Sequence, residues 1–266
     1  MRRYMHYVPL LAALAAILPS AFGWENPSRR IGTTFMNDIA PMIIVGEGWS
    51  VQIVIQNLDP TAAVGIMRFY HRDGTPWDLP LVDHEMDHGE LPLTFQGYET
   101  VVLEVPVSWD YQQLGWGRLD INCCPDLLGQ VIYRKQQADR PDLMTSVPFA
   151  ADMDRSTVYF DNRGWKYAGV GIVNTSPRYA WGPETTPISV TIRDLKGNEI
   201  LHATRDVPKM GFDWFSLVLD YPETIGRAGT IEFITPEYGL SSFSLQFAPN
   251  GAFTNVSPAD TFAPRQ

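Results

Sequence analysis

One short segment of this chain has the residue types and the spacing of a metalloenzyme motif. His84-Glu85-Met86-Asp87-His88 places two histidines four residues apart, with a glutamate directly after the first. On a helix, imidazoles at i and i+4 face the same way and can hold zinc, while the glutamate activates the bound water as a general base. The segment therefore raises the hypothesis of a metal-dependent (zinc) hydrolase.

The surroundings of the motif are unfavourable for a zinc-binding helix. Asp87 lies inside it, Gly89 follows it, and Pro80 and Pro92 bracket the segment, so any helix would have at most about three turns. Two other interpretations stay open. One is binding of a divalent cation without catalysis, with His84, Glu85, Asp87 and His88 as candidate ligands. The other, which we favour, is a solvated acidic loop between two strands.

Other catalytic patterns are missing from the sequence. It has no Gly-x-Ser-x-Gly nucleophile elbow, no glycine-rich phosphate-binding loop and no dinucleotide fingerprint. Carboxylates are plentiful, but one sequence gives no means of pairing two of them across a cleft. We therefore expect no catalytic residues and no cofactor, apart from the divalent cation considered above.

Aromatic residues in the expected loops form the second group of candidates. Exposed rings can stack on the faces of sugars or anchor a protein partner. For each single ring, the alternative is that it caps the end of a hydrophobic core. The densest pair, Tyr179 and Trp181, lies between Pro177 and Pro183. The candidate ligand-binding residues are Trp77, Trp109 with its neighbour Tyr111, Tyr179, Trp181 and Trp214.

The elements that must position these residues are strands. Apolar and polar residues alternate over 49–57, 101–105, 188–192 and 243–247, and turn-forming sequences such as Asp73-Gly74 separate these runs. In the last run, Phe243 and Leu245 alternate with Ser242 and Ser244, which predicts one buried and one polar face. Strands of this kind are typical of antiparallel sheets.

The chain also repeats its strand pattern. Gly48-Trp49 and the following run to Asn57 recur as Gly164-Trp165 and a run to Asn174. Further similar segments keep the same order at an offset of roughly 110–125 residues, which indicates a duplicated domain. We therefore expect an all-β chain of two tandem antiparallel β-sandwich domains, residues 24–150 and 151–266, joined by a polar stretch over 136–154.

Several of these segments carry a resemblance to a known kind of module. They are the run 48–57, Met67-Arg68-Phe69-Tyr70 with the following Asp73-Gly74-Thr75-Pro76, Gly115-Trp116-Gly117-Arg118, and the ending 245–254. Together they resemble a recurrent secreted bacterial immunoglobulin-like β-sandwich repeat of unknown function. The resemblance covers most of residues 40–256 and implies fold and export. It implies no catalytic residue.

The N-terminal sequence indicates the compartment of the protein, and the net charge limits the kinds of partner that it can bind. Arg2 and Arg3, an apolar stretch over 8–18 and Ala21-Phe22-Gly23 are typical of a secretory signal peptide, which we place at residues 1–23. The whole chain has a formal net charge of −10, and this argues against nucleic acid and against anionic membrane surfaces as partners. We expect a secreted or periplasmic protein with no membrane span in its mature form and with a carbohydrate or protein partner.

The only two cysteines are adjacent, Cys123 and Cys124, and so do not form a disulfide framework. Reduced thiols, a strained vicinal disulfide and an intermolecular bridge all stay open as alternatives for this pair.

The function that the sequence predicts is a non-catalytic secreted β-sandwich protein that acts as a binding or structural module at or outside the cell envelope. The alternative is the zinc hydrolase centred on residues 84–88.

Overall fold

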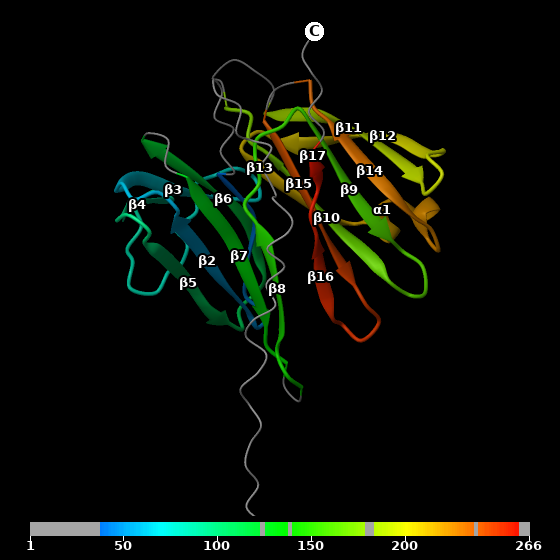
Figure 1. Cartoon of the computed structure of the whole chain (residues 1–266). Coiled ribbons are helices and arrows are strands. Elements are labelled where there is room, and N and C mark those ends of the chain that lie inside the picture. The colour runs from blue at the N-terminus through cyan, green and yellow to red at the C-terminus, as the bar shows by residue number, and fades with distance from the viewer. Residues whose placement is uncertain (1–37, 123–125, 138–139, 179–183, 237–238, 261–266) are drawn as a thin grey trace, which may run out of the picture. The chain divides into compact units, whose positions relative to one another are not determined.

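A computed structural model describes residues 38–122, 126–137, 140–178, 184–236 and 239–260, and antiparallel strands make up most of them. Within these ranges the only helices are α1 (Leu217–Asp220) and the 3-10 helix η1 (Pro222–Thr224). The strands form four sheets in which every pairing is antiparallel (Figure 1). The expected all-β, antiparallel class is confirmed.

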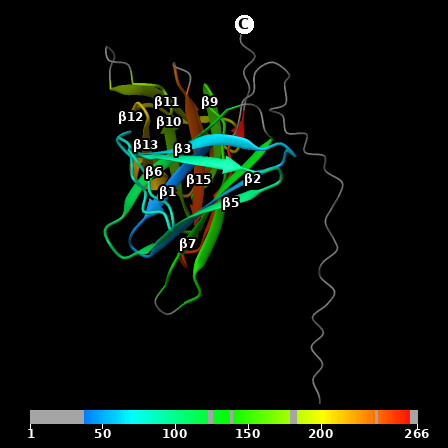
Figure 2. The ribbon, with the colours of Figure 1, turned by 90° about the vertical axis from the view of Figure 1, so that its left-hand side faces the viewer.

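The first half of the chain forms two sheets, which can be followed in Figure 2, where β3 lies above β2, β5 and β7. One sheet has the order β1 (Ile39–Val45), β6 (Gln113–Asn122), β3 (Ala63–His71), β4 (Glu90–Phe95). The other has the order β2 (Trp49–Asn57), β7 (Leu127–Lys135), β8 (Leu143–Pro148). A further strand, β5 (Thr100–Ser108), runs beside β2, since backbone hydrogen bonds of 2.8 Å join Asn57 to Glu99 and Gly48 to Ser108.

The second half also forms two sheets. One has the order β12 (Glu199–Pro208), β11 (Thr185–Asp194), β14 (Ala228–Ile234), β9 (Arg155–Asp161), β17 (Ala259–Asp260). The other has the order β13 (Gly211–Ser216), β10 (Tyr167–Asn174), β15 (Leu240–Phe247), β16 (Phe253–Val256).

The two halves have the same strand order. The order β1-β6-β3-β4 in the first half corresponds to β9-β14-β11-β12 in the second, and β2-β7-β8 corresponds to β10-β15-β16. In each case a strand of the first half matches the strand eight places later in the chain. Two similar stretches of sequence that fold in the same way would give this arrangement.

A hydrophobic core lies between the two sheets of the second half. It joins Val158 of β9, Val190 of β11 and Ile231 of β14 to Val170 and Ile172 of β10, and all five side chains are buried. The first three strands belong to one sheet and β10 belongs to the other. The apolar faces of the two sheets therefore pack against each other, as they do in a sandwich.

The core of the first half extends into the second half. Its cluster of buried side chains includes residues of β1, β2, β3, β6 and β7, and also Val173, Phe212, Phe243 and Leu245 from the second half. The described residues from 38 to 260 thus belong to one compact unit with hydrophobic contacts between its halves.

Strand β15 departs from the expected one-sided burial. Phe243 and Leu245 pack with the cluster of the first half, as the alternation predicts for an apolar face. Ser242 and Ser244 are also buried, and Ser242 Oγ lies 2.6 Å from Ser156 Oγ. The prediction of a solvent-facing polar side is therefore wrong for β15, because the two sides of this strand are covered by different parts of the chain.

The stretch 136–154 is more than a polar connection. It contains β8, and the buried side chains of Phe149 and Met153 follow that strand. β8 runs beside β16 (Figure 1), where the Asn255 backbone N–H donates to Thr145 Oγ1 over 3.3 Å. The predicted boundary near residue 150 thus lies within packed structure.

Candidate functional site

The segment 84–88 is not helical. Residues 84–86 have no regular structure, and Asp87 and Glu90 close a tight turn through backbone hydrogen bonds of 3.3 and 3.0 Å. The two residues inside this turn, His88 and Gly89, have φ angles of 51° and 75°. Positive φ at both central positions is typical of a hairpin turn that matches the twist of the flanking strands. The helix that the zinc hypothesis requires is therefore absent, and the sequence of turn formers explains why.

The side chains of this turn do not converge on a metal position. His84, Glu85, Asp87 and His88 are all exposed, and the His88 and Asp87 side chains are 3.6 Å apart at their nearest nitrogen and oxygen. No group of three or more His, Cys, Asp or Glu side chains suited to a metal ion occurs in the described part of the chain. The turn is instead anchored through its backbone, because Gly89 N–H donates to Asp78 Oδ1 over 2.7 Å.

Two of the candidate aromatic residues contribute to packing. Trp77 is only 4% exposed and stacks on His71 with a ring separation of 5.0 Å. Trp214 is half-buried and stacks on Phe243 at 5.8 Å. Both rings therefore pack against the hydrophobic core, which was the alternative to ligand binding for each of them. Tyr179 and Trp181, the cysteine pair 123–124 and the expected signal peptide 1–23 lie outside the described residues.

Trp109 and Tyr111 are the candidate rings that face solvent. They lie in the connection between β5 and β6 and are 67% and 76% exposed. This connection is tied to the turn between β1 and β2, since Glu47 N–H donates to the Asp110 carbonyl over 2.8 Å. The loop thus presents two aromatic side chains from a backbone that is fixed by a neighbouring turn.

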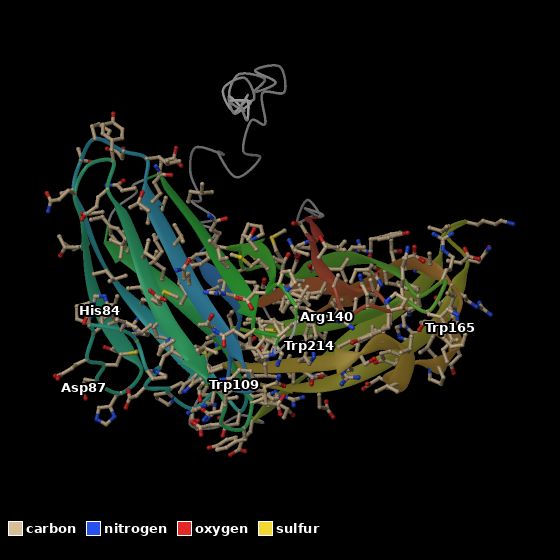
Figure 3. All side chains as sticks on the ribbon, turned by 90° about the horizontal axis from the view of Figure 1, so that it is seen from below. His84, Asp87, Trp109, Arg140, Trp165 and Trp214 are labelled. Carbon is tan, nitrogen blue, oxygen red and sulfur yellow. The ribbon has the colours of Figure 1, made fainter. Side chains whose placement is uncertain are left out.

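The position of the Trp109 ring depends on Gly48. A methyl group on the Gly48 Cα would lie 2.8 Å from two carbon atoms of the Trp109 ring, so only glycine leaves room for the indole at this place. One side of the ring is therefore held against the backbone of the β1–β2 turn. Since two-thirds of Trp109 is still exposed, the ring can offer a flat apolar surface to a ligand (Figure 3).

Two acidic residues lie on the loop of this aromatic pair and on the turn bonded to it. Asp110 lies between the two rings in the chain, and Ser108 Oγ donates to its carboxylate over 2.8 Å. Glu47, on the adjoining turn, is exposed and has a free carboxylate within the described residues, whereas its carbonyl oxygen accepts a bond from Lys135 Nζ. Carboxylates next to an aromatic ring can accept hydrogen bonds from hydroxyl groups of a ligand.

Sequence reasoning missed the most exposed of the described aromatic residues. Trp165, in the turn between β9 and β10, is 91% exposed, and Figure 3 shows it on the second half of the chain. In the sequence it is only the counterpart of Trp49, which is 9% exposed. The alternation of apolar and polar residues does not show which of the two tryptophans is buried, because a tryptophan at the end of a strand is compatible with a buried or an exposed position.

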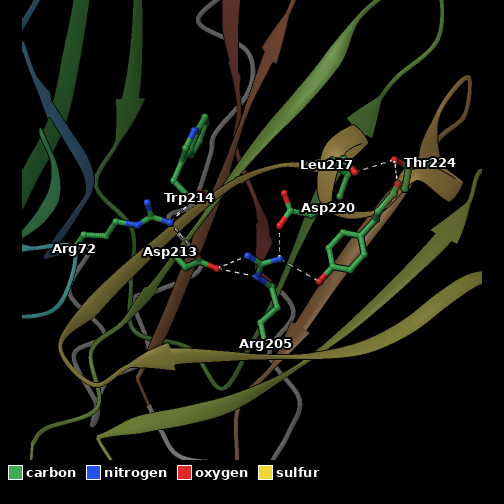
Figure 4. Close-up of polar contacts among 8 residues, drawn as sticks. Arg72, Arg205, Asp213, Trp214, Leu217, Asp220 and Thr224 are labelled. Carbon is green, nitrogen blue, oxygen red and sulfur yellow. Dashed lines mark hydrogen bonds and ion pairs between the residues drawn. The ribbon is translucent and has the colours of Figure 1, made fainter. Parts of the chain in front are cut away.

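An ionic network lies between the two halves of the chain (Figure 4). Asp213 accepts from Arg72 of the first half over 3.0 Å and from Arg205 Nε over 2.8 Å. Arg205 also pairs with Asp220 at 3.0 Å and lies 3.9 Å over the ring of Phe215. Because each charged group here has a partner, the network is suited to holding the halves together and leaves no group free for chemistry.

A second ionic group surrounds Arg118. Its Nε lies 3.2 Å from carboxylate oxygens of both Asp38 and Asp120, and its Nη2 lies 3.4 Å from Asp152. Burial raises the pKa of Asp38 to about 6, with Arg118 opposing the rise and the negative charge of Asp152 adding to it. Thr175 of the second half donates to Asp152 over 2.5 Å. This group therefore also links the two halves.

Comparison of the chain with protein-family models, with curated proteins and with solved structures gives no match. The described residues include no helix with the length and apolar character needed to cross a membrane. The resemblance to secreted immunoglobulin-like repeats therefore stays a prediction from the sequence.

Proposed function

We propose that this protein is an exported, non-catalytic binding module that holds carbohydrate through Trp109 and Tyr111. In this proposal it consists of two immunoglobulin-like β-sandwich domains, residues 24–150 and 151–266, which follow a signal peptide. The signal-like sequence of residues 1–23 supports export, and the equal strand order of the two halves supports the tandem arrangement.

The observation that carries the binding proposal is the exposed aromatic pair on a fixed loop. Trp109 is held against Gly48 on one side, so little conformational entropy would be lost when a ligand covers the other side. The apolar face of a pyranose ring can stack on such an indole, and the carboxylates of Asp110 and Glu47 can accept bonds from its hydroxyl groups. Because the two carboxylates are negatively charged and would repel acidic sugars, these features favour neutral sugars.

The proposal can be tested by sedimentation of the purified mature protein with insoluble polysaccharides such as cellulose, chitin and peptidoglycan. We expect retention by at least one of them, and a loss of at least about tenfold in affinity when Trp109 and Tyr111 are both replaced by alanine. Trp165→Ala is the matched control, because it removes an exposed tryptophan from the other half of the chain. Equal retention of the double variant and the wild type would contradict the proposal, as would a failure of all three polysaccharides to bind.

A further inference from the structure

Strand β12 forms an open edge of the second half. It is the last strand of its sheet, and β11 is the strand that pairs with it (Figure 1). It has ten residues, Glu199–Pro208, and its one proline stands at the end. Within the described part of the chain, no backbone group from outside the sheet forms a hydrogen bond with it. An edge of this length with unpaired backbone groups is a template for pairing with another strand.

The other edge strands are protected. β4 has only six residues and contains Pro92, and β17 has two residues. The Glu104 carbonyl of β5 accepts from Val82 N–H, and the Phe212 N–H of β13 donates to the Arg72 carbonyl, both over 2.9 Å. β8 and β16 run beside each other, and the start of β1 is bonded to the segment after β8. Among the described strands, β12 is therefore the edge that stays open.

The register of β11 and β12 shows which backbone groups of β12 point outward. Pro187 of β11 lies opposite Asp206, and because proline has no N–H, these two residues cannot exchange both backbone bonds. Pairs of this kind alternate with hydrogen-bonded pairs along an antiparallel ladder, so Thr204 and His202 belong to the same class as Asp206. The N–H and C=O groups of these three residues therefore point away from β11, and all three residues are exposed.

The three outward residues are complementary to the same residues of a second copy. With a twofold axis through Thr204, antiparallel pairing places Thr204 opposite Thr204 and His202 opposite Asp206. Pairs of threonines and pairs of opposite charge are favourable across strands. Three N–H groups from each copy then give six backbone hydrogen bonds. An axis through Asp206 would instead bring two carboxylates face to face, which is unfavourable.

The side chains on both faces of β12 agree with this register. His202 Nδ1 lies 3.1 Å from Thr191 Oγ1, which leaves the other ring nitrogen for the carboxylate of the second copy. On the opposite face, Ala203 of one copy lies opposite Arg205 of the other, so a small side chain meets a large one. Arg205 is paired with Asp213 of its own chain at 2.7 Å. The register therefore brings no like charges together.

We propose that two copies of this chain pair through β12 and form a dimer. The five-stranded sheet of each second half then continues into that of the other copy across the twofold axis. The dimer uses residues of the second half, whereas the proposed sugar contact lies on the first half at Trp109 and Tyr111. The proposal thus goes beyond carbohydrate binding and does not rest on it.

The test is sedimentation equilibrium of the purified protein. We expect a dimer for the wild type and a dimer at least about tenfold weaker for Thr204→Pro, because proline removes two of the six backbone bonds. The variant keeps its fold, since the lost N–H points away from β11, and circular dichroism can verify this. Thr94→Pro is the matched control on edge strand β4. Thr94 lies two residues after Pro92, so its N–H also points outward, and this variant should dimerise like the wild type.

A charge exchange tests the register itself. His202→Asp places two carboxylates opposite each other and should weaken the dimer by about tenfold. Adding Asp206→His restores one imidazole opposite one carboxylate and should restore the dimer.

Three results would overturn the proposal. The first is a wild type that stays monomeric up to about 100 μM. The second is equal dimerisation of the wild type, Thr204→Pro and His202→Asp. The third is a double variant, His202→Asp with Asp206→His, that is no better than His202→Asp alone. A monomeric protein could still be retained by polysaccharides through Trp109, so this proposal and the proposed function can fail separately.

Discussion

The carboxyl group of Asp38 should make the folded protein more stable in mild acid than at neutral pH. Its side chain is only 14% exposed, and burial raises its pKa from 3.8 to about 6. In the unfolded chain the group returns to its ordinary pKa. Between these two values the folded protein holds a proton that the unfolded chain releases, so stability falls as the pH rises from about 4 to about 7.

The size of this effect follows from the two pKa values. Each unit of difference corresponds to about 1.4 kcal/mol, which gives an upper bound of about 3 kcal/mol for the full window. Between pH 7 and about pH 4.5 the linkage relation gives a gain of about 2 kcal/mol in the free energy of unfolding. Asp161 does not interfere, because Arg163 lowers its pKa to about 2 and its contribution changes only at more acidic pH.

Urea unfolding of the wild type and of Asp38→Asn at these two pH values measures the effect. The difference in unfolding free energy between the two proteins should change by about 2 kcal/mol, because asparagine does not titrate. Asp59→Asn is the control, since hydrogen bonds from Thr61 lower the pKa of this exposed carboxyl and move its titration out of the window. A change below about 0.5 kcal/mol for Asp38→Asn, or a change of opposite sign, would refute the reasoning.

Three further predictions concern single side chains. Trp116→Phe removes the indole N–H that donates to the Met210 carbonyl over 3.0 Å and should lower the free energy of unfolding by about 1–2 kcal/mol in urea titrations; an unchanged midpoint would show that this contact between the halves is unimportant. Asn162→Ala should cost about 2–3 kcal/mol, because it leaves buried partners without hydrogen bonds, and thermal unfolding would contradict this if the midpoint stayed the same. Glu85→Ala should change stability by less than about 0.5 kcal/mol, since the side chain is exposed; a larger change in urea titrations would contradict this, and only the loss of a hydrolytic activity would restore the zinc hypothesis.

Local patterns determine much of the fold. Alternating residues predict strands such as 49–57 and 243–247, and the structure has strands at both places. The proline and glycine residues around residues 84–88 argue against a helix, and a hairpin turn is found there. These features depend on the chain's own backbone preferences and on side-chain spacing, which the sequence contains directly.

What covers each strand is decided only by the tertiary structure. The serines of β15 look like a solvent face in the sequence, but both sides of this strand are buried. Likewise, Trp49 and Trp165 have similar neighbours in the sequence, and yet one is buried and the other is 91% exposed. An alternating sequence indicates that the two faces of a strand differ in polarity, whereas the burial of each face depends on which distant segment packs against it. That information lies in contacts between residues far apart in the chain, so a local pattern cannot supply it.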